Sequence, residues 1–143
     1  MVRGFATRQL GQLADARALP ALLPMLHADD PWIRQLAAQS LGQIGDSRAI
    51  GPLAGALGDK QRRVCFQAAR ALEDIKDPGT VAHFIAALEH EHQDVRVVAA
   101  RALGQLKDRR AIPALRKASK EASSNVASEA RRALEAIECG PER

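Results

Sequence analysis

The chain has 143 residues and a formal net charge of +4; alanine and leucine are abundant, tyrosine is absent and tryptophan occurs once. This composition favours packed helices over a β-sheet, and the moderate charge permits an acidic partner without requiring one. The two cysteines, Cys65 and Cys139, fit neither a disulfide framework nor a metal motif. No apolar run is long enough to span a membrane and no secretion signal is evident, so we expect a cytoplasmic protein unless further residues precede Met1.

A pair of aliphatic residues with the pattern Leu-x-x-Leu/Ile recurs at a fixed distance of 31 residues. The pairs are Leu10/Leu13, Leu41/Ile44, Leu72/Ile75, Leu103/Leu106 and Leu134/Ile137. Such a period is typical of stacked helical repeats that share one elongated core. We therefore predict an all-α solenoid of about four and a half helix pairs, forming one domain over residues 1–143. Its parts are a half repeat 1–14, full repeats 15–45, 46–76, 77–107 and 108–138, and a tail 139–143.

Each repeat reads as a shorter helix A followed by a longer helix B. Residues 2–13 read as a helix B alone, whose partner would precede the chain. Residues 17–27 should form the next helix A, in which Pro20 fits the first turn and Pro24 should kink or loosen the helix. Residues 31–44 then form a helix B, with an expected buried stripe of Ile33, Ala37, Ser40, Leu41 and Ile44.

Turn residues separate the repeats. Gly45 should end the helix B before it, because glycine adopts the left-handed conformation at low cost, and Asp46 should cap the helix A at 48–57. The third helix B departs from the pattern, with Cys65 where other copies have arginine. The last repeat is polar at positions that are apolar in earlier copies, namely Ser119, Glu129 and Arg131. Such polarity is expected of a repeat that ends the stack.

Charged residues recur at two positions of the repeat. Aspartates at the A-helix starts are Asp15, Asp46, Asp77 and Asp108, and arginines near the B-helix starts are Arg3, Arg34 and Arg96. We predict that these aspartates and arginines pair between adjacent repeats, with the third pair missing at Cys65. Partly shielded pairs of this kind contribute more than the ~0–1 kcal/mol of exposed ones. The alternative is that the charges are solvated helix ends.

Two motifs make up the repeat. One reads Asp46-Ser47-Arg48-Ala49-Ile50-Gly51-Pro52-Leu53, and the other reads Val95-Arg96-Val97-Val98-Ala99-Ala100-Arg101-Ala102-Leu103-Gly104. Together they closely resemble the HEAT-like repeats of the phycobilisome lyase (PBS lyase) type, over nearly the whole chain. The resemblance implies a right-handed superhelix with the B helices lining a concave face. It also implies protein–protein scaffolding in most members, with a minority of bilin lyase subunits, iron hydroxylases and DNA-binding proteins.

The helical period places some B-helix positions opposite the buried stripe. With a step of about 100° per residue, Gln35 and Gln39 lie roughly 160° and 200° from Ala37. These positions, with the one at Trp32, give the candidate partner-binding residues Arg8, Trp32, Gln35, Gln39, Arg63, Phe66, Arg70, Val97, Arg101 and Arg132. Arginine beside exposed aromatic and aliphatic groups is typical of protein-binding surfaces. The alternatives are that the arginines only cover alanine-rich helices, that Trp32 packs on its own helix start, or that the helix carrying Phe66 is rotated.

Metal and catalytic sites have little support in the sequence. His90-Glu91-His92 lies in a loop without a second ligand cluster, whereas zinc or iron needs three or four convergent ligands, so we interpret it as a solvated polar loop. The iron hydroxylases that the resemblance includes carry a His-Glu pair on the B helix. The equivalent pairs here are Gly4-Phe5, Gln35-Leu36, Phe66-Gln67, Val97-Val98 and Ser128-Glu129. We therefore predict no metal, no cofactor and no such activity.

Three functions remain open from the sequence. The first is a non-catalytic scaffold whose concave B-helix face binds an acidic or amphipathic protein segment, with Phe66 and Val97 giving apolar contact and arginines pairing with carboxylates. The second is an accessory subunit of a bilin lyase, in which arginines would bind propionates. The third is a nucleic-acid-binding module, which the modest charge and scarce aromatic residues disfavour. The uncapped first helix is also a candidate dimer contact.

Overall fold

A computed structural model describes residues 16–139, so the expected half repeat at the N-terminus lies outside the described residues. The chain divides into two compact units, Met1–Lys76 and Asp77–Arg143. This division coincides with the expected boundary between the second and third full repeats. That the whole chain forms one domain stays a prediction.

All the regular secondary structure that is described in unit 1 is helical. In chain order its elements are η1 (Ala16–Ala18), α2 (Leu19–Leu22), η2 (Leu23–His27), α3 (Pro31–Ile44), η3 (Ser47–Ala49), α4 (Ile50–Ala56) and α5 (Arg62–Ile75), where η denotes a 3-10 helix. The long helices α3 and α5 are B helices, and the shorter segments before each of them form the A helices. α3 has the bounds expected from the sequence.

Unit 2 repeats the same plan. Its described elements are η4 (Pro78–Thr80), α6 (Val81–Ala87), α7 (Gln93–Leu106), η5 (Arg109–Ala111), α8 (Ile112–Ala118) and α9 (Ser124–Glu138). Here α7 and α9 are the B helices, and α6 and α8 belong to the A helices. No strand occurs between residues 16 and 139, and the predicted all-α repeat architecture is confirmed.

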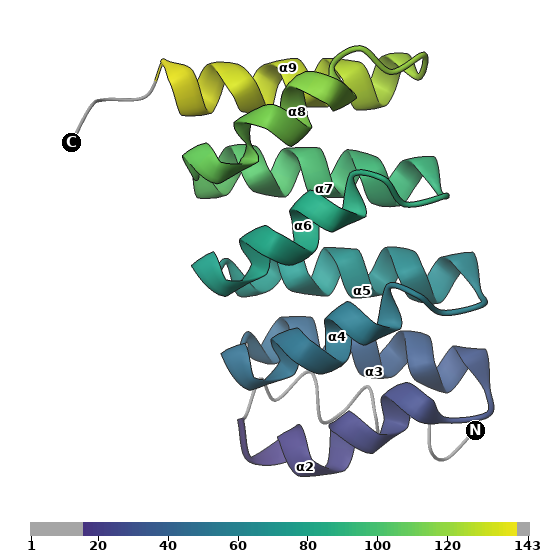
Figure 1. The fold of residues 1–143 in the computed structure, drawn as a ribbon. Coiled ribbons are helices and arrows are strands. Elements are labelled where there is room, and N and C mark those ends of the chain that lie inside the picture. The colour runs from purple at the N-terminus through teal and green to yellow at the C-terminus, as the bar shows by residue number, and fades with distance from the viewer. Residues whose placement is uncertain (1–15, 140–143) are drawn as a thin grey trace. The chain divides into compact units, whose positions relative to one another are not determined.

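Within each unit the helices form two layers (Figure 1). The B helices lie side by side, α3 against α5 and α7 against α9, and the A helices cover one side of them. The core lies between the layers: Ile33, Ala37 and Leu41 of α3 are at most 4% exposed, and Ser40 beside them is 2% exposed. The buried stripe of this helix therefore follows the predicted period, and the small residues in it let neighbouring helices approach closely.

Two glycines permit a particularly close approach of the B helices. A Cβ atom on Gly42 of α3 would lie 2.7 Å from the Cα of Ala71 in α5. In unit 2, a Cβ on Gly104 of α7 would lie 2.9 Å from the Cα of Ala133 in α9. Atoms in a packed interior do not approach so closely, so any larger residue at either position would push the two B helices apart.

Left-handed residues end the B helices α3, α5 and α7, whereas Cys139 at the end of α9 has a φ of −98°. Gly45 follows α3 with a φ of 72°, as expected from its lack of a side chain. Lys76 follows α5 with a φ of 55°, and Lys107 follows α7 with a φ of 53°. A residue with a Cβ adopts this conformation only at a cost in energy, so the two lysine turns are less favourable than the glycine turn.

The first described helix A is interrupted by proline. α2 has only four residues, and the 3-10 helix η2, with Pro24 in its first turn, follows it directly. Proline lacks an N–H and its ring clashes with the preceding turn, so the α-helical bonding pattern does not continue across it. The prediction that Pro24 loosens this helix is confirmed. Pro20 lies at the start of α2, where its missing N–H is harmless.

The aspartates that start the A helices do not pair with the repeated arginines, so this prediction is wrong for the described residues. The carboxylate of Asp46 accepts the backbone N–H of Arg48 at 2.9 Å and its guanidinium at 2.8 Å, which holds the pKa of Asp46 at about 2. Asp108 binds Arg110 in the same way, at 2.9 and 2.7 Å. Each aspartate therefore caps its own turn, as expected for Asp46, and is already occupied.

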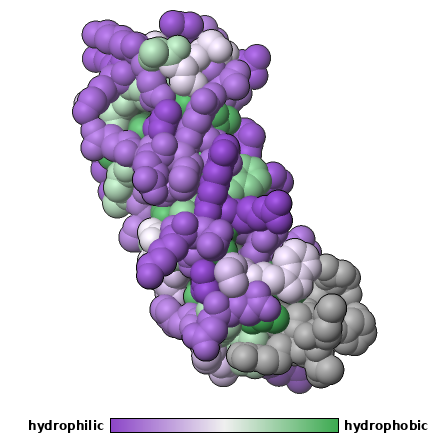
Figure 2. All heavy atoms as spheres, turned by 90° about the vertical axis from the view of Figure 1, so that its right-hand side faces the viewer, coloured by the Kyte–Doolittle hydropathy of each residue, from purple (hydrophilic) through white to green (hydrophobic). Residues whose placement is uncertain are grey.

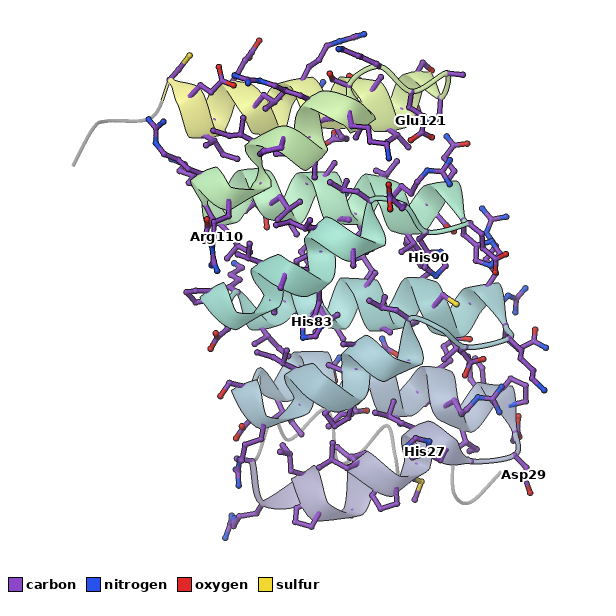
Figure 3. All side chains as sticks on the ribbon, in the orientation of Figure 1. His27, Asp29, His83, His90, Arg110 and Glu121 are labelled. Atoms are coloured by element: carbon purple, nitrogen blue, oxygen red, sulfur yellow. The ribbon has the colours of Figure 1, made fainter. Side chains whose placement is uncertain are left out.

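The arginines near the B-helix starts bind a different acid. Arg34 Nε donates to Asp59 at 2.7 Å in unit 1, and Arg96 Nε donates to Glu121 at 2.9 Å in unit 2. Both acids lie in the loop between helices A and B of the following repeat. In Figure 3, Glu121 of unit 2 lies at the right-hand ends of the B helices and Arg110 lies at their left-hand ends. The predicted pairing fails because the A-helix aspartates and these arginines lie at opposite ends of the B helices.

The same arginine position also fastens the A-to-B loop of its own repeat. Three B helices bind the carbonyl group six residues earlier, through Arg34 to Ala28 at 2.7 Å, Cys65 to Asp59 at 3.1 Å and Arg96 to His90 at 2.7 Å. Cys65 replaces an arginine and keeps this local bond through its S–H group. Its role in the described structure is therefore that of a buried helix residue that closes the loop before α5.

Candidate functional site: the outward face of the B helices

The candidate site in unit 1 is the side of α3 and α5 opposite the buried stripe. Trp32 is 48% exposed. The other predicted residues of this unit are exposed (Gln39, Arg63 and Arg70) or half-buried (Gln35 and Phe66). The solvent-facing position predicted from the helical period holds for Trp32, Gln39, Arg63 and Arg70, whereas Gln35 and Phe66 are half-buried. We call this surface the outward face of unit 1.

Arg70 and Phe66 form a local pair one helical turn apart. The guanidinium carbon of Arg70 lies 5.8 Å from the centre of the Phe66 ring, within the range of a cation–π contact. The Nε of Arg70 also lies 3.7 Å from a carboxylate oxygen of Glu73, whose side chain is 9% exposed. The side chain of Arg70 is 49% exposed, so its charge remains accessible to solvent.

On the outward face of unit 2, an acidic residue stands where unit 1 has an arginine. Val97 and Arg101 of α7 are half-buried and Arg132 of α9 is exposed. Arg132 donates to the carboxylate of Glu129 at 3.3 Å, so its charge is partly compensated on its own helix. Asp94, at the repeat position that Arg63 has in unit 1, accepts the backbone N–H of Val95 at 2.9 Å. The remaining candidate, Arg8, lies outside the described residues.

The two histidines of the loop before α7 form a local structure. The ring centres of His90 and His92 are 5.3 Å apart, and Nδ1 of His90 accepts the backbone N–H of His92 at 3.1 Å (Figure 3). Asp59 accepts the backbone N–H of Gln61 in the equivalent loop of unit 1 at 2.9 Å. His90 therefore shapes its loop as an aspartate would. Over residues 16–139, no group of three or more His, Cys, Asp or Glu residues could hold a metal ion.

A pocket of about 580 Å³ in unit 2 was not anticipated from the sequence. Its apolar part includes Ile85 and Leu88, and Lys117 lies at its edge. The ammonium group of Lys117 donates to the carboxylate of Glu89 at 2.5 Å, which lowers the pKa of Glu89 and raises that of Lys117. The charges of Lys117 and Glu89 are thus paired within the protein. The lining combines residues that recur between repeats, such as Leu88 and Arg96, with residues that do not, such as Lys120.

The side of the molecule that carries the A-to-B loops is mostly hydrophilic (Figure 2). Apolar side chains show there only in small areas between the polar ones. Among the described helices, none combines the length and the apolar character that crossing a membrane requires. The exposed tryptophan on α3 therefore stands out as an apolar group on a largely polar exterior.

Comparison with known proteins agrees with this architecture. The family model for HEAT repeats matches residues 1–73 and 63–135. No curated protein is significantly similar to the chain in sequence.

Several solved structures have a similar fold. One is the complex of CpcE and CpcF of phycocyanin lyase from Nostoc sp. PCC7120, with 24% identity, a TM-score of 0.80, and coverage of 97% of this chain and 60% of that chain. This chain thus spans less than two thirds of that protein's length. An engineered protein has 27% identity, a TM-score of 0.65, and coverage of 96% and 74%. A designed armadillo repeat protein in complex with the peptide (KR)4 has 22% identity, a TM-score of 0.71, and coverage of 92% and 69%.

These likenesses confirm the α-solenoid fold that the resemblance to repeats of the phycobilisome lyase type implied. The two matched segments together extend over residues 1–135, which is nearly the whole chain. The described helices also recur as A and B pairs, as the period predicts. On this sequence and structural evidence, the chain belongs to the HEAT-repeat family.

Proposed function

We propose that this protein is a non-catalytic scaffold that binds an acidic or amphipathic segment of a protein partner on the outward face of its B helices. The observation that carries the proposal is the exposure of Trp32 on α3 and of Arg70 beside Phe66 on α5, two helices whose inward residues are buried. Such residues contribute little to the core, whereas arginine and aromatic groups are enriched in protein interfaces.

The arginines set the expected chemistry of the partner. A guanidinium group binds a carboxylate through two parallel hydrogen bonds, so acidic side chains complement Arg70, Arg101 and Arg132. Phe66 and Val97 are half-buried beside them and offer apolar contact. A segment that combines acidic and apolar residues would use both features of the surface.

An affinity pull-down from cell extract tests this function. The variant with both Arg70→Glu and Arg101→Glu should lose its partner, because like charges then face the acidic segment. A matched control carries Arg109→Glu and Lys120→Glu, two exposed cations outside the outward face, and changes the net charge equally. Retention of the same partner by the first variant, with both variants folded, would refute the proposed site.

A second candidate is an accessory subunit of a bilin lyase. Its support is the likeness in fold to the CpcE and CpcF complex of phycocyanin lyase, although this chain spans 60% of that chain. In this function, outward-facing arginines would bind the propionates of a bilin. Incubation of the protein with a bilin and an apo-phycobiliprotein, with and without a complementary subunit, tests it. Absence of covalently attached pigment in both reactions would reject this candidate.

A further inference from the structure

The outward face of unit 1 differs in charge from that of unit 2. On α5, Arg63 and Arg70 lie on the same side of the helix with Phe66 between them. The equivalent repeat positions of α3 are Trp32, Gln35 and Gln39, which carry no charge. In unit 2, Asp94 takes the position of Arg63, and Glu129 lies one turn before Arg132. Glu73 and Asp74 likewise lie near Arg70 on α5, so the difference that favours an acidic segment on unit 1 is Arg63 in place of Asp94.

The spacing of these groups selects a conformation of the partner. Arg63, Phe66 and Arg70 follow an i, i+3, i+7 pattern, so the two arginines are separated by about 10.5 Å along the helix axis. A second helix has the same separation between its own residues i and i+7. An extended chain places side chains on one side at intervals of about 6.6 Å, so it would match both arginines poorly.

From this pattern we propose that unit 1 binds an amphipathic partner helix laid along α5, with acidic residues at i and i+7 and a large apolar residue at i+3 or i+4. The inference rests on the proposed scaffold function and names the anchor, which is the set of residues Arg63, Phe66 and Arg70 that binds the partner helix. The two acids pair with Arg63 and Arg70, and the apolar residue packs on Phe66. The exposed Trp32 of α3 lies in the same unit and extends the apolar contact.

Other charged residues near Arg63, Phe66 and Arg70 restrict which residues the partner helix can carry. Asp74 is one turn beyond Arg70 on α5, so the partner helix carries a basic or neutral residue, and not a third acid, at the next turn. Asp59 is engaged by Arg34. Among the described residues, Arg63 has no acidic partner of its own. Arg70 has Glu73 at 3.7 Å, a separation that leaves room for a closer carboxylate.

The single tryptophan of the chain provides a direct assay, because it lies on the proposed anchor surface. A synthetic helix without tryptophan, bridged to hold its conformation, carries Glu at i and i+7, Leu at i+4 and Lys at i+11. Titration of the full chain should shift the emission of Trp32 in a saturable way. The variant with Arg63→Glu and Arg70→Glu should bind at least tenfold more weakly, and a peptide with Gln in place of both Glu residues should bind similarly weakly.

Three comparisons separate this inference from the function it rests on. The variant with Arg101→Glu and Arg132→Glu, confined to unit 2, should bind the synthetic helix within about threefold of the original affinity. A larger loss there than in the unit 1 variant would overturn the anchor while leaving the scaffold function intact. Absence of binding to the folded chain at concentrations near 1 mM would overturn it as well, since such affinity is negligible. Phe66→Leu should bind better than Phe66→Gln, and the opposite order would exclude apolar packing at Phe66.

Discussion

Replacing Arg34 with alanine should lower the free energy of unfolding by about 1.5–3 kcal/mol, the range for hydrogen bonds that involve charged groups. The guanidinium of Arg34 donates to Asp59 at 2.7 and 3.1 Å and to the carbonyl of Ala28 at 2.7 Å. The side chains of Arg34 and Asp59 are 16% and 10% exposed, so water replaces these bonds only in part. The estimate stays below that for a fully buried ion pair because some solvent reaches both groups.

The pH dependence of this loss follows from the titration of Asp59. Burial raises the pKa of Asp59, but the hydrogen bond from Arg34 and the N–H of Gln61 outweigh it and hold the pKa below its ordinary value. The folded pKa is therefore lower than the unfolded one. The stability that ionised Asp59 provides is present above its unfolded pKa and is lost as the pH falls through its folded pKa. In the Arg34→Ala variant, less stability remains to be lost in acid.

Urea unfolding followed by circular dichroism measures both effects. Unfolding free energies at neutral pH give the loss, and a series from about pH 5 to pH 2 gives its acid dependence. Arg48→Ala is the matched control, because its salt bridge with Asp46 has a similar length but its side chain is 68% exposed. It should change the stability far less. Equal losses in the two variants, or additive losses in a double-mutant cycle of Arg34 and Asp59, would refute the reasoning.

Three further changes test the packing and the turns by the same unfolding measurement. Gly42→Ala should destabilise the protein by about 1–2 kcal/mol, because its Cβ would overlap the Cα of Ala71, whereas Gly55→Ala in α4, where nothing lies within 4 Å, should stabilise it by up to about 1 kcal/mol. Lys107→Gly should add about 0.5–1 kcal/mol by relieving the left-handed backbone. Phe84→Ala, at a side chain that is 1% exposed, should cost about 3–5 kcal/mol.

The fold was readable from the sequence because a solenoid expresses its core as a period. Each inward position recurs every 31 residues, so the buried stripe of α3 and its bounds could be predicted before any contact was known. The same period fixes the opposite side of each helix. This is why the exposure of Trp32 was predictable from helix phase alone, whereas the partial burial of Phe66, which was expected to face solvent, was not.

The charge pairing was not readable in the same way. Recurrence showed that Arg34 and Asp46 are both repeated, and their places at the start and just after the end of α3 already put them at opposite ends of that helix. Side-chain bonds depend on distances of a few ångströms, and Asp46 satisfies its own turn first. A usable signal was present: Asp59 and Glu121 occupy the same repeat position, each 25 residues after an arginine that it binds. The signal is weak because the same loop position holds Ala28 and His90 in the other two described repeats.

In the proposed function, folding depends on the inward positions of the B helices and binding depends on the outward positions of the same helices. The inward residues of α3 and α5 follow one pattern, whereas the outward ones change from Trp32 to Arg63 and from Gln39 to Arg70. Substitutions at exposed positions usually alter stability by less than about 0.5 kcal/mol. The outward residues can therefore change without loss of the stack. Under the proposed function, the differences between equivalent outward residues, rather than the repeated motif itself, set the partner preference.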